Sequence, residues 1–123
     1  MSLSEPAGGL FVKPYEEIHA LEARSRMDTG AILVDVREPA EWAAGHVEGA
    51  RHIPLAQLGQ RHGELPVGRP VITVCRSGAR SARAATLLAG QGRDASNLDG
   101  GMRAWAAAGL PVVTEGGRPG AVI

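Results

Sequence analysis

The chain of 123 residues is 44% hydrophobic and balances 13 Lys and Arg residues against 13 Asp and Glu residues. That length fits one domain with its own core, and the zero net charge argues against a nucleic-acid binder or a polybasic membrane module. A single cysteine excludes an internal disulfide, a Cys-x-x-Cys redox pair and a cysteine-based zinc site, and no apolar run approaches the roughly 18 residues of a membrane helix.

The first half of the chain alternates helix and strand signals. Residues 1–9 carry no signal-peptide pattern, so we expect a cytoplasmic protein. We expect one domain at residues 10–113, with flexible termini at 1–9 and 114–123. The predicted elements, in chain order, are a helix at 14–26 with Tyr15, Ile18 and Leu21 on one face, a buried strand at 31–34, a short helix at 39–44 ended by Gly45, an extended segment at 50–54 and a weak helix at 55–62.

The second half continues the alternation. It predicts a strand at 71–74, a helix at 79–89, a strand at 95–98 and a last helix that starts near residue 102. The residues expected to face inward are Ala84, Leu87 and Leu88 on the first helix, and Met102, Trp105 and Ala106 on the second. Because apolar strands alternate with helices, the predicted fold is α/β, with a parallel sheet covered by helices on both faces.

One loop carries the residues that favour chemistry, Cys75-Arg76-Ser77-Gly78-Ala79-Arg80-Ser81, directly after the strand at 71–74. In open parallel sheets, ligands bind beyond the carboxyl ends of the strands. Gly78 lets the loop curl, so that successive N–H groups form an anion-binding nest at the positive end of the next helix. Such a nest stabilises a Cys75 thiolate, and Arg76 and Arg80 add guanidinium groups for an oxyanion.

The simpler interpretation of Cys75 is a small buried core residue, which is the commoner fate of a lone cysteine after an apolar strand. A glycine and two arginines within the next five positions favour instead a nucleophile that attacks an anionic substrate.

Three blocks of the sequence resemble the signatures of the single-domain rhodanese-like sulfurtransferases. Residues 75–81 are similar to the active-site loop of that family, residues 33–54 (LVDVREPAEWAAGHVEGARHIP) to its N-terminal signature, and residues 98–105 (LDGGMRAW) to its C-terminal one. The resemblance implies a rhodanese-like three-layer α/β fold with a mainly parallel five-stranded sheet.

The resemblance also implies a reaction. Cys75 would attack the outer sulfur of thiosulfate or of a persulfide donor, hold it as a persulfide, and pass it to cyanide, a thiol or a sulfur-carrier protein, with no metal or organic cofactor. The loop residues Ser77, Gly78, Ala79 and Ser81 would hold the persulfide. Arg76 and Arg80 would bind the sulfonate of the donor, with Arg76 expected to tune substrate preference rather than to be essential.

Two other functions compete with this one. A non-catalytic rhodanese-like module would bind or regulate a partner, but such modules typically lack the cysteine. The active-site loop of the related phosphatases and arsenate reductases resembles the pattern C-x5-R, which accommodates a larger tetrahedral anion. The loop from Cys75 to Arg80 has the pattern C-x4-R, which is one residue shorter. Arsenate reduction also usually requires a second thiol, so sulfur transfer is favoured.

Several other residues have weaker claims. Asp35 and Arg37 follow a strand and could support the loop, but we expect a structural role, in which Asp35 caps the short helix or pairs with an arginine. Trp42 and Trp105 are expected in the core. The four histidines have no ligand spacing and no cysteine partner, so no metal site is predicted, although a Cys-His dyad stays open.

Overall fold

A computed structural model describes residues 13–123, so the predictions for residues 1–9 and for the start of the domain lie outside the described residues. The elements in chain order are β1 (Glu16–Ile18), α2 (Ala20–Asp28), β2 (Ile32–Asp35), α3 (Pro39–Ala44), β3 (Arg51–His52), α4 (Leu55–Arg61), the 3-10 turn η1 (His62–Glu64), β4 (Val71–Val74), α5 (Ala79–Gly90), β5 (Ala95–Leu98) and α6 (Gly101–Ala107). No helix within this range is long and apolar enough to cross a bilayer.

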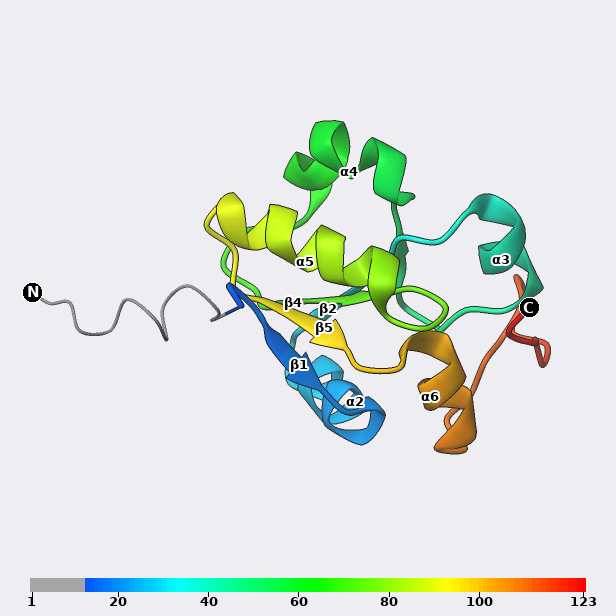
Figure 1. Cartoon of the computed structure of the whole chain (residues 1–123). Helices are drawn as coiled ribbons and strands as arrows, with labels where there is room; N and C mark the ends of the chain where they lie inside the picture. The colour runs from blue at the N-terminus through cyan, green and yellow to red at the C-terminus, as the bar shows by residue number, and fades with distance from the viewer. Residues whose placement is uncertain (1–12) are drawn as a thin grey trace, which may run out of the picture.

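The five strands form one sheet in the order β1-β5-β4-β2-β3, and every pair is parallel. Helices α4 and α5 cover one face, and α2 and α6 cover the other (Figure 1). The predicted three-layer α/β fold with a five-stranded parallel sheet is therefore confirmed. In the central pair, β2 and β4 run in register from Ile32 opposite Val71 to Asp35 opposite Val74, so the residues after both strands meet at one edge.

Each face of the sheet carries its own apolar cluster. The cluster under α4 and α5 contains Val34, Val36, Leu58, Val71, Ala84 and Leu88, among others, and the cluster under α2 and α6 contains Leu33, Ile72, Val74, Leu98, Met102 and Trp105, among others. Alternate residues of β2 and β4 face opposite clusters, as the two-residue period of a strand requires. Small alanines let α5 lie close to the sheet and compensate for the scarcity of aromatic side chains.

The inward faces predicted for the last two helices are observed except at Ala106, and Leu87 packs against the core. Ala84 and Leu88 are fully buried and Leu87 is partly buried, whereas Ala106 is exposed. In the seven-residue helix α6 the buried side chains are Met102 and Trp105, one turn apart. The next position after Trp105 rotates about 100° further round the helix, which turns Ala106 into solvent.

The prediction of one helix at residues 14–26 is wrong in its first part. Glu16–Ile18 forms the edge strand β1, and α2 starts only at Ala20. Ile18 is buried opposite Leu98, whereas Leu21 is 65% exposed. The helical spacing of these residues was coincidental, because α2 buries its two small residues, Ala20 and Ala23, which give little amphipathic signal.

The prediction that both tryptophans lie in the core holds only for Trp105, which is 1% exposed. Helix α3 contributes no buried residue, and Trp42 lies on it half-exposed. Its ring stacks on His46 at 3.7 Å and on His52 at 4.8 Å between centroids. The indole therefore packs against imidazoles of the following loop and strand instead of against the aliphatic core.

Residues 114–123, expected from the sequence to be a flexible terminus, make backbone hydrogen bonds to the rest of the domain. Val113 forms antiparallel bridges with His46 and Pro119, and the Ala121 N–H donates to the Ala44 carbonyl at 2.9 Å. A side chain at Gly45 would collide with Ala121, so this glycine permits the close approach. The tail therefore lies against the end of α3.

Candidate active site

Cys75 lies where the sequence places it, in the loop between β4 and α5, with only 1% of its surface exposed. The Gly78 N–H donates to the Cys75 Sγ at 3.1 Å, and the Ser81 hydroxyl lies 3.3 Å from the same sulfur. Burial raises the pKa of the Cys75 thiol. The hydrogen bonds of the Ser81 hydroxyl and of the Ser81, Gly78 and Ser77 amides outweigh it, so the pKa falls below its ordinary value.

The loop holds this shape through Gly78, which is the residue before α5 and has a φ of +116°. Its carbonyl accepts hydrogen bonds from the Ala82 N–H at 3.1 Å and from the Asn97 side-chain amide at 3.2 Å. The Thr73 hydroxyl donates to the Ser81 carbonyl at 2.8 Å. Buried polar side chains of β4 and β5 therefore fix the loop from beneath.

The amino end of α6 holds the same loop from the other side. The Met102 N–H donates to the Cys75 carbonyl at 2.8 Å, and the Arg103 N–H donates to the Arg76 carbonyl at 3.1 Å. These bonds use N–H groups that a helix start leaves without partners inside the helix. Gly101, with a φ of +61°, lies so close that a side chain there would meet the Cys75 carbonyl and lie 2.6 Å from the Arg76 carbonyl.

Gly101→Ala should therefore damage the loop more than an alanine at an ordinary left-handed glycine. Gly109 is the matched control, because its φ is +80° and no atom lies within 4 Å of its would-be side chain. Urea unfolding should show a loss of about 1–2 kcal/mol for Gly109→Ala from backbone strain. Gly101→Ala should lose roughly 1–3 kcal/mol more from overpacking. Equal losses would contradict the close contact.

The guanidinium groups of the two loop arginines are bound to partners other than the thiol. Arg80 makes a bidentate ion pair with Glu41 of α3, at 2.7 and 2.8 Å. This pair lowers the pKa of Glu41 to about 2 against the opposing effect of burial, with help from the Glu38 amide, and raises the pKa of Arg80. The pair stays charged at any ordinary pH, and Cys75 contributes a smaller share of the rise at Arg80.

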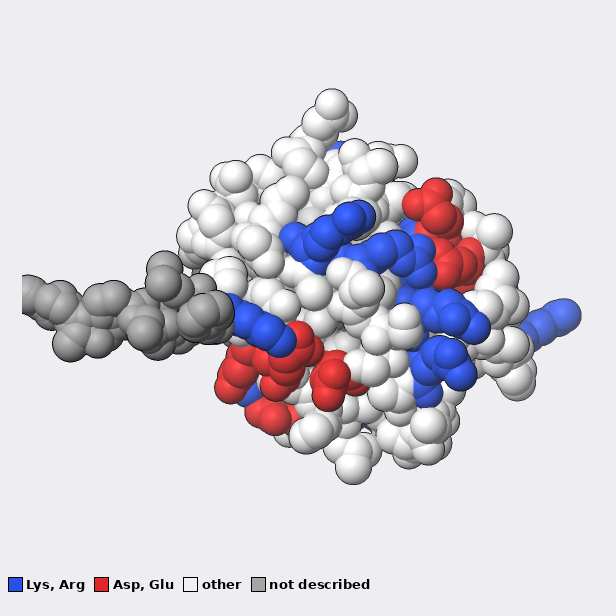
Figure 2. Space-filling model, viewed as in Figure 1, with Lys and Arg blue, Asp and Glu red and all other residues white. Residues whose placement is uncertain are grey.

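Arg76 is exposed, and its Nε donates to the carbonyl of Ile123 at 2.8 Å. The C-terminal segment is thus in contact with the loop as well as with α3. This contact leaves the two terminal nitrogens of the Arg76 guanidinium available. Figure 2 shows basic side chains gathered over the face that carries this loop, with one acidic group beside them in the region of α3 and another near β1 and α2.

Asp35 and Arg37 form a fully buried ion pair at the same edge of the sheet. Arg37 binds both carboxylate oxygens of Asp35, with Nη2 at 2.7 Å, and also donates to the Gly45 carbonyl at 2.8 Å. The partner of Asp35 is therefore an arginine and not the start of α3, which is capped by Glu38 and Glu41. The pair ties the end of β2 to the end of α3 and makes no hydrogen bond to the thiol.

Sequence reasoning missed four residues that shape the site, namely Glu41, Thr73, Asn97 and Gly101. Glu41 and Gly101 stand inside the two flanking signature blocks, which was a usable signal. Thr73 and Asn97 are polar residues in fully buried strands, and the hydrogen bonds of each are directed at the loop or its neighbours. Because buried polar groups must find hydrogen-bond partners, polar residues in strands next to a candidate nucleophile indicate side chains that support its loop.

The fold and site together define an α/β domain with a buried cysteine in the loop between β4 and α5. A family model described as "Rhodanese-like domain" matches residues 19–108. The chain belongs to the rhodanese-like family. Among solved structures, a rhodanese-related protein from Thermoplasma volcanium superimposes with a TM-score of 0.77 at 30% identity, over 82% of this chain and 100% of that one.

Curated relatives carry sulfurtransferase names. A sulfurtransferase of Allochromatium vinosum is 45% identical over 87 residues, which span 70% of this chain and 81% of that protein. Thiosulfate sulfurtransferase GlpE of Pseudomonas putida is 39% identical over 89 residues, or 72% and 79% of the two chains. The YqhL protein of Bacillus subtilis is 47% identical over 76 residues, which span 61% of this chain and 60% of that protein. The two relatives that are named as sulfurtransferases support the sulfurtransferase class.

Proposed function

We propose that this domain transfers sulfur from an anionic donor, thiosulfate or a persulfide, to a thiol or cyanide acceptor through a persulfide on Cys75. The observation that carries the proposal is a cysteine whose sulfur accepts hydrogen bonds from Gly78 and Ser81 and whose pKa is lowered. The names of the relatives and the basic face around the loop support the choice of an anionic sulfur donor.

The first step makes one S–S bond and breaks another. The Cys75 thiolate attacks the outer sulfur of thiosulfate, and the donor's own S–S bond breaks with its electron pair on the departing sulfite. The enzyme keeps a Cys75 persulfide, whose terminal sulfur carries the negative charge. The amides of Ser77 and Gly78, at the positive end of α5, stabilise that charge.

The second step returns the enzyme to its starting state. A thiolate acceptor attacks the outer sulfur of the persulfide, becomes a persulfide itself, and releases the Cys75 thiolate; cyanide leaves as thiocyanate in the same way. Arg76 binds the donor sulfonate through its terminal nitrogens, which the bond to Ile123 leaves available. Arg80 assists only with the part of its guanidinium that does not face Glu41.

The proposal is tested by intact mass after brief incubation with thiosulfate and then with cyanide. We expect the mass of one sulfur atom to be gained and then lost. A gain from a low-molecular-weight thiol persulfide but not from thiosulfate would restrict the donor to persulfides. No gain from either donor would overturn the proposal in favour of a non-catalytic module.

The pH dependence of Cys75 reactivity should follow its hydrogen bonds. Because Cys75 is the only cysteine, the rate of alkylation by iodoacetamide reports on this thiol alone. The thiolate is the reactive form, so a lowered pKa keeps the rate high until the pH falls well below the ordinary thiol pKa of about 8.5. Ser81→Ala removes the hydroxyl donor and should move the profile to higher pH.

Ser77→Ala is the matched control for this experiment, because Ser77 acts through its backbone amide, which the substitution keeps. Its profile should stay with that of the parent protein. Identical profiles for the Ser81 and Ser77 variants would mean that the Ser81 hydroxyl does not stabilise the thiolate.

A further inference from the structure

A hollow lies on the side of the sheet that α2 and α6 cover, and none of the residues that line it belongs to the Cys75 loop. It has a volume of about 440 Å³ and is lined from α2, the segment between α3 and β3, the start of β2 and α6. Its residues include Ile32, which pairs with Val71 at the amino ends of β2 and β4, whereas Cys75 follows Val74 at their carboxyl ends. The hollow is therefore separate from the candidate active site.

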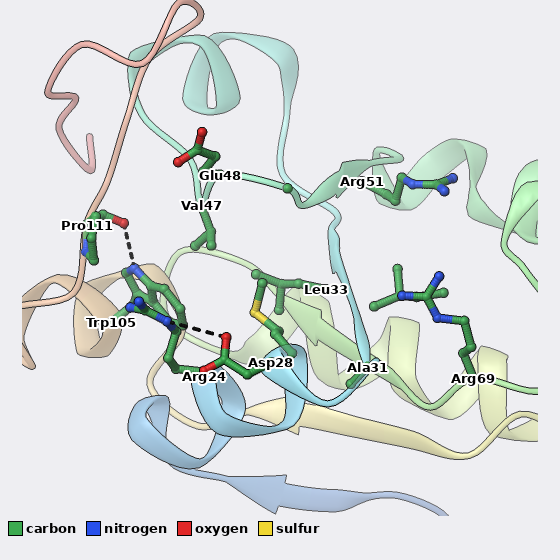
Figure 3. Close-up of a pocket in the computed structure, with 13 residues that line it drawn as sticks. Arg24, Asp28, Ala31, Leu33, Val47, Glu48, Arg51, Arg69, Trp105 and Pro111 are labelled. Carbon is green, nitrogen blue, oxygen red and sulfur yellow. Dashed lines mark hydrogen bonds and ion pairs between the residues drawn. The ribbon is translucent and has the colours of Figure 1, made fainter.

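The floor of this cavity is apolar. Leu33, Val47 and Trp105 line it and are at most 4% exposed, and Met27 packs beside them. The Trp105 Nε1–H already donates to the Pro111 carbonyl at 2.8 Å, so the indole has no free donor for a ligand (Figure 3). An apolar group placed here would be removed from water against rigid core side chains.

Two arginines stand on the side of the cavity away from Trp105 (Figure 3). The Arg69 Nε donates to the Gly30 carbonyl at 2.7 Å, which fixes the guanidinium and leaves its terminal nitrogens free to bind. Within residues 13–123 the Arg51 side chain makes no hydrogen bond or ion pair. Glu64 is near enough for Arg51 to help lower its pKa, but Arg61 binds that carboxylate at 3.0 Å.

The acidic residues of the lining do not cancel both arginines. Asp28 is paired with Arg24 at 4.0 Å, one turn apart on α2, at the other side of the cavity. The Glu48 carboxylate is directed away from Arg51 and Arg69 (Figure 3). Three arginines and two carboxylates line the cavity, which leaves an excess of one positive charge over the whole lining, and two of the arginines lie together on the side away from Trp105.

We propose that this cavity binds a monocarboxylate with an apolar chain or ring, its carboxylate between Arg51 and Arg69 and its apolar part over Leu33 and Val47 toward Trp105. Guanidinium groups bind carboxylates with paired hydrogen bonds, and burial of the apolar part adds affinity. A singly charged ligand matches the net excess of one positive charge better than a dianion does. Such a ligand has no counterpart in the sulfur-transfer reaction, so this is a second binding site.

The test uses the full chain labelled with nitrogen-15 and octanoate below its micelle-forming concentration. Octanoate should shift the Trp105 indole N–H and the amides of Leu33 and Val47 in a saturable manner. Octanol, of equal length but without charge, should bind far more weakly. Arg51→Gln and Arg69→Gln should each weaken octanoate binding roughly tenfold, since each removes a charge-assisted hydrogen bond.

Arg118→Gln is the matched control, an exposed arginine of the tail outside the lining, and should leave octanoate binding unchanged. Sulfur loading of Cys75 should be the same in the Arg51→Gln/Arg69→Gln double variant as in the parent protein. The proposal is overturned if octanoate causes no saturable shift, if octanol binds equally well, or if the double variant keeps the affinity of the parent.

Discussion

Cys75→Ser should abolish sulfur transfer while the domain stays folded. A serine hydroxyl is close to a thiol in size and can accept the hydrogen bond from the Gly78 N–H, so the loop keeps its shape. It is not ionised near neutral pH and forms no persulfide, so turnover should fall by at least about 10³-fold, as when other enzymes lose a nucleophile. Steady-state thiocyanate formation and the intact-mass assay measure the loss.

The outcome is informative only if the fold survives, which urea unfolding of the same variant checks. We expect the free energy of unfolding to change by less than about 1 kcal/mol, within the range of a volume-conserving exchange. Substantial turnover by a folded Cys75→Ser protein would show that the thiolate is not the nucleophile. An unfolded protein would show that the thiol is needed for packing, which is the simpler interpretation of a buried cysteine.

The second large effect concerns stability. Asp35→Asn removes the charge that balances Arg37, and both side chains are 0% exposed. A buried ion pair that loses one partner leaves an uncompensated charge in the interior, which typically costs about 3–5 kcal/mol. That is a large share of the roughly 5–15 kcal/mol that holds a domain folded. Urea unfolding should show the loss, whereas Asp94→Asn, at an exposed aspartate, should be nearly neutral.

A double variant keeps the prediction testable if the Asp35→Asn protein does not fold. Asp35→Asn combined with Arg37→Met removes both charges and should recover much of the loss, because a buried pair is often replaceable by apolar side chains of similar size. Incomplete recovery is expected, since Arg37 also donates to the Gly45 carbonyl. A single Asp35→Asn variant that loses less than 1 kcal/mol would refute the structural importance of the pair.

The features that the sequence could predict are those written in contiguous residues. The strands at 71–74 and 95–98 and the helix α3 have the predicted bounds. Pro70 precedes the apolar run of β4, Gly100 follows β5 closely, and Pro39 and Gly45 mark the two ends of α3. The position of Cys75 after β4 follows from the same local pattern. The glycine that precedes α5 is likewise a local signal, since Gly78 has a backbone conformation that other residues rarely adopt.

The parts that could not be predicted depend on residues far apart in the chain. The Arg80–Glu41 pair joins positions separated by 39 residues, and the Arg76 contact with Ile123 spans 47. No residue near Arg80 in the sequence indicates that its guanidinium will form an ion pair with a carboxylate of another helix. The stacking of Trp42 on His46 and His52 similarly depends on how α3 and β3 meet, which only the assembled sheet determines.

Helix α3 is attached to the domain mainly by polar contacts, which has a consequence for local unfolding. None of its residues is buried, and it is held by the Glu41–Arg80 pair, by the Ala44–Ala121 hydrogen bond and by the stacking of Trp42 on His52. Just beyond its end, Arg37 donates to the Gly45 carbonyl. Displacement of α3 would therefore expose little of the apolar core, and its free-energy cost lies in breaking these polar and stacking contacts. Because Glu41 leaves with it, each such displacement frees the Arg80 guanidinium beside the thiol for a competing anion.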